Sequence, residues 1–103
     1  MKDPIADFKA KVVRSQLDEV VVYHVGALGA DISSSPTLTN IQMFAYGLYL
    51  MGRVGLRQLR IPITAEDGTV LRHTTEYSFK ILQPVHALDF DTARKAYLTN
   101  LKH

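Results

Sequence analysis

Histidine has the widest range of chemistry in this sequence, because its side chain can act as a general base or bind a metal ion. Four positions carry it: His24, His73, His86 and His103. Their spacing does not match a metal site, since no two stand at positions i and i+4 and the chain contains no cysteine. His24 and His73 lie in expected strands, and we interpret both as partly buried histidines with hydrogen-bond partners. They are the only candidate general bases. Because we interpret both as structural and the chain has no cysteine nucleophile, we expect no catalytic residue and no enzymatic activity. We also expect no metal and no cofactor.

Phosphate binding is a second possibility, and two glycine-containing segments bear on it. Residues 26–29 (GALG) and 52–55 (GRVG) contain paired glycines, but neither has the full motif spacing or the strand-turn-helix setting of a phosphate loop. We interpret these glycines as a bend and a helix cap. Tyr46 and Tyr49 could stack on nucleic-acid bases, yet they lie in an uncharged segment, where packing explains them better.

The net charge of +2 is concentrated in one part of the chain. Residues 53–80 contain five basic residues against three acidic ones, and two of these acids, Glu66 and Asp67, lie in an expected turn. The basic residues are candidate nucleic-acid-binding residues that would contact phosphates: Arg53, Arg57, Arg60, Arg72 and Lys80. Half-exposed strands also carry such residues for solubility, and that explanation fits the pattern equally well.

The most apolar segment is an expected helix in the middle of the chain. Residues 32–52 contain no charged side chain, and residues 41–52 (IQMFAYGLYLMG) are apolar on almost every side of a helix. A Ser-Pro start signal and a terminal glycine place this helix at residues 36–51. One stripe faces the core, and the opposite stripe needs cover from the terminal helices or from a second copy of the chain. We favour a homodimer, whose predicted interface residues are Met43, Tyr46 and Leu50.

Three further elements follow from local patterns. Asp3 and Pro4 form a start signal for a helix over residues 4–16, with apolar residues at helical spacing. Residues 20–25 (VVVYHV) predict a strand that is apolar on both faces, which we expect to lie at the centre of the sheet. A last helix is expected to begin at Asp89 or Asp91.

A β-hairpin is predicted between the last two helices. The Glu66-Asp67-Gly68 cluster separates two strand-like runs and indicates a loop longer than two residues. In the second strand, alternate residues from 71 to 81 form an inward face. A change of alternation in the first strand predicts a bulge or an irregular start of the strand near residues 55–58. Pro62 cannot donate to a ladder, so this strand either ends there or lies at an edge of the sheet.

These elements predict an α+β fold in the order helix, strand, helix, hairpin, helix, with a small three-stranded sheet in a single domain over residues 1–103. If the central helix crosses over, the first two strands run parallel in a mixed sheet; if it folds back, the sheet is an antiparallel meander. The absence of cysteine, of an apolar leader and of a membrane-length run predicts a cytoplasmic protein without membrane contact.

Three segments together carry a resemblance: YHVGALGAD (residues 23–31), MGRVGLRQLRI (residues 51–61) and EYSFKI (residues 76–81). They resemble short bacterial and phage-associated proteins of unknown function, in which a Tyr-His-x-Gly-x-Leu strand precedes a helix and a Gly-Arg-Val strand. The resemblance implies a phage or mobile-element context and no defined activity.

A helix followed by a basic hairpin is also similar to the winged-helix DNA-binding arrangement, with the hairpin as the wing. The chain departs from that arrangement because its central helix has no charged side chain to offer to a DNA groove. Two hypotheses result. In the first, a homodimer contacts nucleic acid through its basic hairpins. In the second, the chain is a protein-binding regulator, such as a phage-encoded inhibitor of a host factor.

Overall fold

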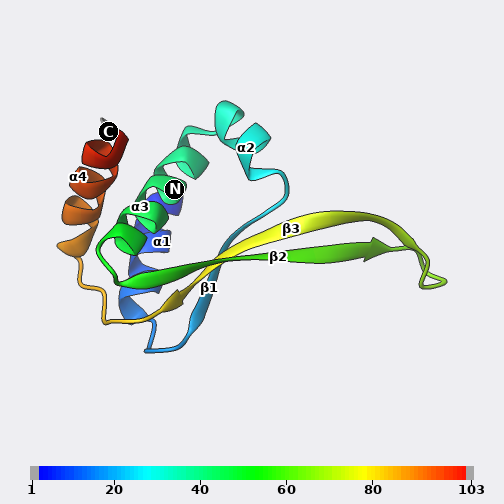
Figure 1. The fold of residues 1–103 in the computed structure, drawn as a ribbon, viewed down its shortest axis with the longest axis horizontal. Coiled ribbons are helices and arrows are strands. Elements are labelled where there is room, and N and C mark those ends of the chain that lie inside the picture. Colours follow the sequence, from blue (N-terminus) through cyan, green and yellow to red (C-terminus); the bar gives the residue numbers. More distant parts are fainter. Residues whose placement is uncertain (1–2, 102–103) are drawn as a thin grey trace.

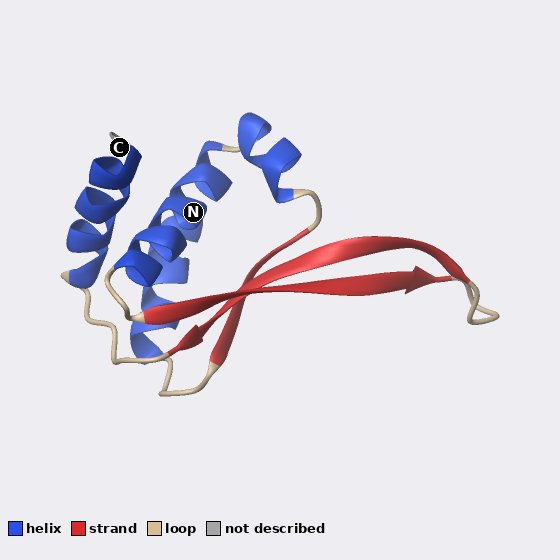
Figure 2. Cartoon of the chain, viewed as in Figure 1, coloured by secondary structure: helices blue, strands red, loops and turns tan. Residues whose placement is uncertain are grey.

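The computed structural model describes residues 3–101, so His103 lies outside the described residues. Four α-helices, one short 3-10 helix and three strands follow one another along the chain (Figures 1 and 2). Their order is α1 (Pro4–Arg14), β1 (Val20–Val25), α2 (Leu28–Asp31), η1 (Ile32–Ser34), α3 (Pro36–Leu50), β2 (Val54–Thr64), β3 (Val70–Ile81) and α4 (Asp89–Leu101). The α+β class and the predicted order of the major elements are confirmed, and α2 and η1 form two additional short helices between β1 and α3.

The two N-terminal caps form as predicted. The carboxylate of Asp3 accepts hydrogen bonds from the backbone N–H groups of Ile5 and Ala6, and the hydroxyl of Ser35 accepts one from Leu38. In each case proline occupies the first helical position, where no intrahelical N–H is needed. Gly52, with φ +78°, ends α3 in a conformation that favours glycine.

The sheet has the order β1-β3-β2, so β3 is its central strand. β3 pairs antiparallel with both neighbours. β1 and β2 therefore run in the same direction, joined through α3, which confirms the strand directions of the crossover alternative. Because β3 lies between them, the sheet is antiparallel throughout, so the predicted mixed sheet and the meander order were wrong. The prediction that β1 lies at the centre was also wrong. It lies at an edge, and Val20, Val22 and Val25 are exposed on the face that no described helix covers.

The core lies between the sheet and one layer of helices, α1, α3 and α4 (Figure 1). Phe79 of β3 is fully buried, and the ring of Phe8 from α1 meets it edge-on at 6.1 Å. Phe90 of α4 contacts Phe8 and Phe44 in the same edge-on manner, which ties the three helices to one aromatic cluster. The core cluster consists of Phe8, Val12, Val21, Met43, Phe44, Ala45, Leu48, Val54, Phe79, Ile81, Val85, Phe90 and Ala93.

The β2–β3 hairpin extends well beyond β1 and the helices (Figure 1). β2 pairs with β3 over its whole length, but β1 pairs only with the stretch from Lys80 to Glu76. The distal part of the hairpin is thus a two-stranded ribbon, which gives the molecule its elongated dimensions of 48 × 34 × 30 Å. The five residues between the strands confirm the prediction of a longer loop.

Pro62 lies in β2, which is an edge strand, as one of the two predicted alternatives requires. The predicted bulge or irregular strand start near residues 55–58 is wrong, because the pairing is regular there. The register shifts instead at Leu71, which is left without a partner in β2, and at Tyr23, which is left without one in β3. No helix within residues 3–101 is long and apolar enough to cross a membrane.

Candidate interaction site on the hairpin arm

The distal ribbon, residues 59–75, is the part of the molecule that its own fold leaves most open, and we call it the arm. Three of its apolar side chains are exposed, Leu59 by 54%, Val70 by 50% and Leu71 by 66%, whereas Ile61 and Ile63 are half-buried. On the same strands, Phe79, Ile81 and Val54 are completely buried under the helices. The inward face predicted for residues 71–81 therefore exists only at the base of the hairpin, because the helical layer ends before the arm begins.

Arg53 is a structural residue. Its Nη2 lies 3.8 Å from a carboxylate oxygen of Asp89, and its Nη1 donates to the side-chain oxygen of Gln83 at 3.0 Å. Its backbone carbonyl accepts from the N–H groups of Leu82 and Gln83. These contacts join the start of β2 to the segment that leads into α4, so the structure does not present this arginine as a free phosphate ligand.

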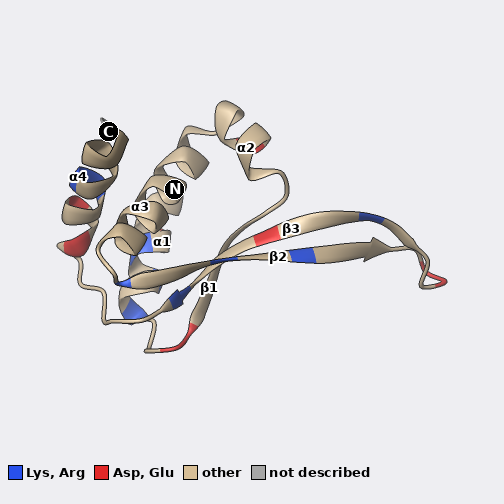
Figure 3. Cartoon of the chain, in the orientation of Figure 1, with Lys and Arg blue, Asp and Glu red and all other residues tan. Residues whose placement is uncertain are grey.

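The basic positions are spread along the hairpin (Figure 3), and the other four predicted phosphate contacts do not all lie on one face of it. Lys80 lies at the base of the hairpin, 3.5 Å from the carboxylate of Asp18. Arg57 pairs with Ser78, and Arg72 pairs with Ile63. Because side chains alternate between the two faces of a strand and these two pairs are an even number of residues apart, Arg57 and Arg72 lie on the same face of the β2–β3 ladder. Arg60 lies on the opposite face, where its Nη2 donates to Nδ1 of His73 at 3.3 Å.

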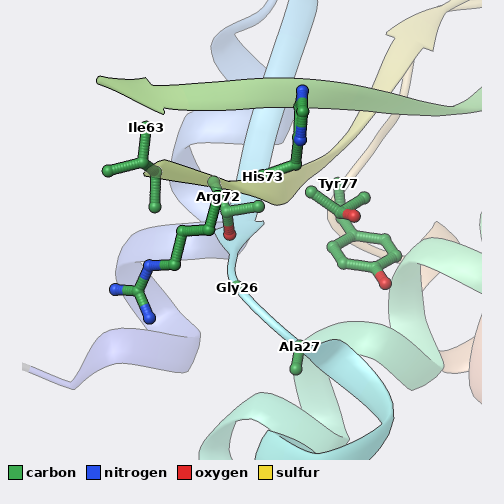
Figure 4. A pocket seen from close by; sticks show the side chains of 8 residues that line it. Gly26, Ala27, Ile63, Arg72, His73 and Tyr77 are labelled. Carbon is green, nitrogen blue, oxygen red and sulfur yellow. The ribbon is translucent and has the colours of Figure 1, made fainter. Parts of the chain in front are cut away.

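A hollow of about 530 Å³ lies where the arm leaves the body of the molecule. Its lining residues are Gly26, Ala27, Ile63, Arg72, His73, Thr74, Thr75 and Tyr77. Figure 4 shows the side chains of Arg72, Ile63 and Tyr77 on the side of Gly26 and Ala27, while the ring of His73 points to the opposite side. The hollow thus combines one cationic side chain, apolar surface and the backbone of β3.

A short contact holds the end of β1 beside this hollow. His24 Nε2 lies 2.7 Å from a carboxylate oxygen of Asp31, which ties β1 to α2. Gly26 lies between them with φ +140°, and a Cβ there would come within 3.0 Å of the same oxygen. The prediction that His24 has a hydrogen-bond partner is confirmed. His73 also has one, the guanidinium of Arg60, but its side chain is exposed and not partly buried.

The pKa values of two groups, Tyr23 in β1 and Asp67 at the tip of the arm, are shifted from their ordinary values. Burial raises the pKa of the Tyr23 hydroxyl above its ordinary value, and the nearby Tyr77, whose ring centre is 6.4 Å away, raises it further. At the tip of the arm, hydrogen bonds from Thr69, first of all from its backbone N–H, lower the pKa of Asp67. The carboxylate of Asp67 therefore stabilises the turn.

The apolar stripe expected to form a dimer interface is covered mainly from within the chain. Met43 is buried, and the ring of Tyr46 meets that of Tyr97 from α4 edge-on at 6.0 Å. Only Leu50, near the end of α3, stays exposed, beside α4. α4 supplies the cover for which we expected a second copy, so the reason for placing a homodimer at Met43, Tyr46 and Leu50 is removed.

Among residues 3–101, no three histidine, aspartate or glutamate side chains come together as metal ligands. Neither the arm's reach beyond the helices nor the hollow at its base follows from the sequence. The only available signal for the arm was strand length, because the hairpin strands are about twice as long as β1. In comparisons with known proteins, no protein-family model, no curated protein and no solved structure matches this chain. The resemblances to phage-associated proteins and to winged-helix domains therefore stay predictions.

Proposed function

We propose that this chain is a non-enzymatic binding protein that holds a protein partner with its arm. The observation that carries the proposal is the exposure of Leu59, Val70 and Leu71 on a ribbon with no helix over either face. A two-stranded hairpin is marginally stable in water, and large apolar side chains gain free energy when a partner covers them. A protein surface that packs against the arm would supply this cover.

The charges of the arm favour a protein over a nucleic acid. Arg60 and Arg72 are balanced by Glu66 and Asp67 in the turn, so the arm carries no net charge when His73 is neutral. Nucleic-acid binding depends on an excess of positive charge along one surface. Protein interfaces, by contrast, combine apolar side chains with a few arginines, which is the composition of the arm.

A photo-crosslinking amino acid placed on the arm tests the proposal directly. The substitution of p-benzoylphenylalanine for Leu71, in cells that naturally produce the protein, should give one discrete covalent adduct with another polypeptide. The same substitution at Leu88, a 79% exposed residue before α4, is the matched control and should give none. An adduct of twice the chain mass would identify the partner as a second copy. Adducts with nucleic acid, or equal labelling from both positions, would overturn the proposal.

Nucleic-acid binding is the second candidate, supported by one observation. Arg57, Arg72 and Lys80 lie on one face of the β2–β3 ladder, and Arg57 and Arg72 have no ion-pair partner among the described residues. If these residues contact phosphates, the logarithm of the affinity for duplex DNA should fall linearly with the logarithm of salt concentration, and Arg57→Ala should reduce the slope by about one. Binding that is absent at low salt, or independent of salt, would remove this candidate.

A further inference from the structure

β3 has an open edge next to the hollow. β1 covers this edge from Lys80 to Glu76, and its last hydrogen bond runs from the N–H of Gly26 to the carbonyl of Thr75 at 2.9 Å. Beyond this point, residues 70–74 of β3 have no partner on the β1 side, and all of them except Leu71 pair with β2. An edge of this kind presents backbone donors and acceptors to which another strand can pair.

The pairing pattern identifies which backbone groups are open. Ile81 donates to Glu19 and Thr75 accepts from Gly26, so the odd-numbered residues of β3 direct their backbone groups toward β1. By the same alternation, the N–H and C=O of His73 point past the end of β1 into the space beside the hollow. Opposite His73, on the β2 side, lies Pro62, which has no N–H to offer.

The end of β1 is built into the structure. Gly26 adopts φ +140°, which turns the chain out of the sheet, and the 2.7 Å contact between His24 and Asp31 holds the following segment in that position. β1 therefore cannot extend along residues 70–74 unless this contact breaks. The space beside β3 stays accessible to a strand from elsewhere.

We propose that an extended, acidic peptide segment of a partner protein adds to β3 here as a fourth strand, antiparallel to β3 and in line with β1. The proposal rests on the proposed function, of which it specifies the partner's chemistry. The open backbone groups of His73 select a polypeptide, because a nucleic acid has no alternating N–H and C=O groups with which to pair. Arg72 and Ile63 line the hollow and would contact an acidic and an apolar side chain.

A second copy of the chain fits this edge less well. Antiparallel pairing of β3 with β3 about a two-fold axis would place the Arg72 side chains of both copies close together, and like charges that face each other across strands destabilise a sheet. Charge complementarity therefore favours an acidic segment. The flanking bulge at Leu71 limits the added strand to a few residues.

Synthetic peptides can test the proposal with the intact protein. The probe is a fluorescent decapeptide in which valine alternates with glutamate, together with its lysine counterpart and two isomers N-methylated at opposite sets of alternate amides. We expect the glutamate peptide to bind and the lysine peptide not to bind. One methylated isomer should lose binding and the other should retain it, because only one edge of an added strand faces β3. Equal binding of both methylated isomers would overturn the proposal.

Two variants and one exchange measurement complete the test. Arg72→Glu should weaken the glutamate peptide by about tenfold or more, whereas Arg57→Glu, a matched reversal outside the hollow, should change the affinity by less than about threefold. Bound peptide should slow hydrogen exchange at the His73 amide. If the glutamate peptide fails to bind while the Leu71 photo-crosslink still forms, strand addition is wrong and the proposed function stands. If both fail, both are wrong.

Discussion

The backbone of Ala93 in α4 lies directly against Gly47 in α3, so close that a methyl group on Gly47 would overlap the Ala93 carbonyl. Gly47 is the only glycine of the described helices at which an added Cβ would meet the backbone of another helix. Tyr46, the residue before Gly47, meets Tyr97 edge-on, and Tyr97 lies one turn beyond Ala93 in α4. This close approach lets α4 cover the second apolar stripe of α3, for which the sequence does not identify a covering segment.

We therefore expect Gly47→Ala to destabilise the protein by about 1–3 kcal/mol, because the two helices must separate to admit the methyl group. Urea unfolding followed by circular dichroism would measure the change. Gly29→Ala is the control, since nothing lies within 4 Å of the added methyl group and the residue is helical. It should leave the free energy of unfolding unchanged or raise it by up to about 1 kcal/mol, because alanine favours a helix over glycine. Equal effects of the two substitutions would show that α3 and α4 are not packed through Gly47.

The sequence predicted the elements well because their signals are local. The Asp3-Pro4 and Ser35-Pro36 pairs place two helix starts, and the turn residues from Glu66 to Gly68 place the hairpin. Each signal depends on hydrogen bonds or backbone angles within a few residues. Such signals therefore do not depend on contacts with distant parts of the chain.

The arrangement of the elements could not be predicted, because it depends on contacts between distant segments. Val20, Val22 and Val25 have the composition of a strand buried on both faces, yet they are exposed at an edge. The second stripe of α3 has the composition of an interface, yet Met43 is buried within the chain and Tyr46 packs against Tyr97 of α4. Hydrophobic periodicity reports that a face needs cover, and it does not say which segment supplies it.

The candidate site was predicted only as a set of charges. The five basic residues were grouped by their position in the hairpin, but alternation places Arg60 on the face opposite Arg57 and Arg72. Arg53 and Lys80 have acidic partners that lie far from them in sequence, Asp89 and Asp18. Only the three-dimensional fold separates structural arginines from free ones.

This division of roles is testable at Arg53. We expect Arg53→Ala to lower the free energy of unfolding by about 1–2 kcal/mol, because it removes the hydrogen bond to Gln83 and the ion pair with the mostly buried Asp89. Arg57→Ala removes a cation of the same strand without such contacts and should change it by less than about 0.5 kcal/mol. Urea titrations of both variants would compare them. A larger loss for Arg57→Ala would reverse the assignment.

A second test concerns the contact that ends β1. Asp31→Ala should reduce global stability by less than about 1 kcal/mol, because the Asp31 carboxylate is partly exposed and solvent screens its interaction with His24. Its effect on the local stability of the end of β1 should be larger than its effect on global stability. Hydrogen exchange at the Gly26 amide, which bonds to the Thr75 carbonyl, should become faster as the 27–31 segment loosens.

The control for this test is Glu66→Ala, which removes an exposed carboxylate of the hairpin turn that makes no hydrogen bond among the described residues. Exchange at Gly26 should not respond to it. If Asp31→Ala also leaves the Gly26 amide unchanged, the contact between His24 and Asp31 does not hold the end of β1.

Tyr23 makes stability depend on pH in the alkaline range. Burial first, and Tyr77 second, raise the pKa of its hydroxyl in the folded protein. Between the unfolded value of about 10 and the folded value, the native state holds a proton that the unfolded state has lost, so stability falls as pH rises. We expect the free energy of unfolding to decline above about pH 10 and Tyr23→Phe to remove a part of this decline. Urea unfolding at a series of pH values from 8 upward would measure both proteins. Parallel curves for the native chain and Tyr23→Phe would show that Tyr23 titrates alike in the folded and unfolded states, contrary to its half-buried position beside Phe79.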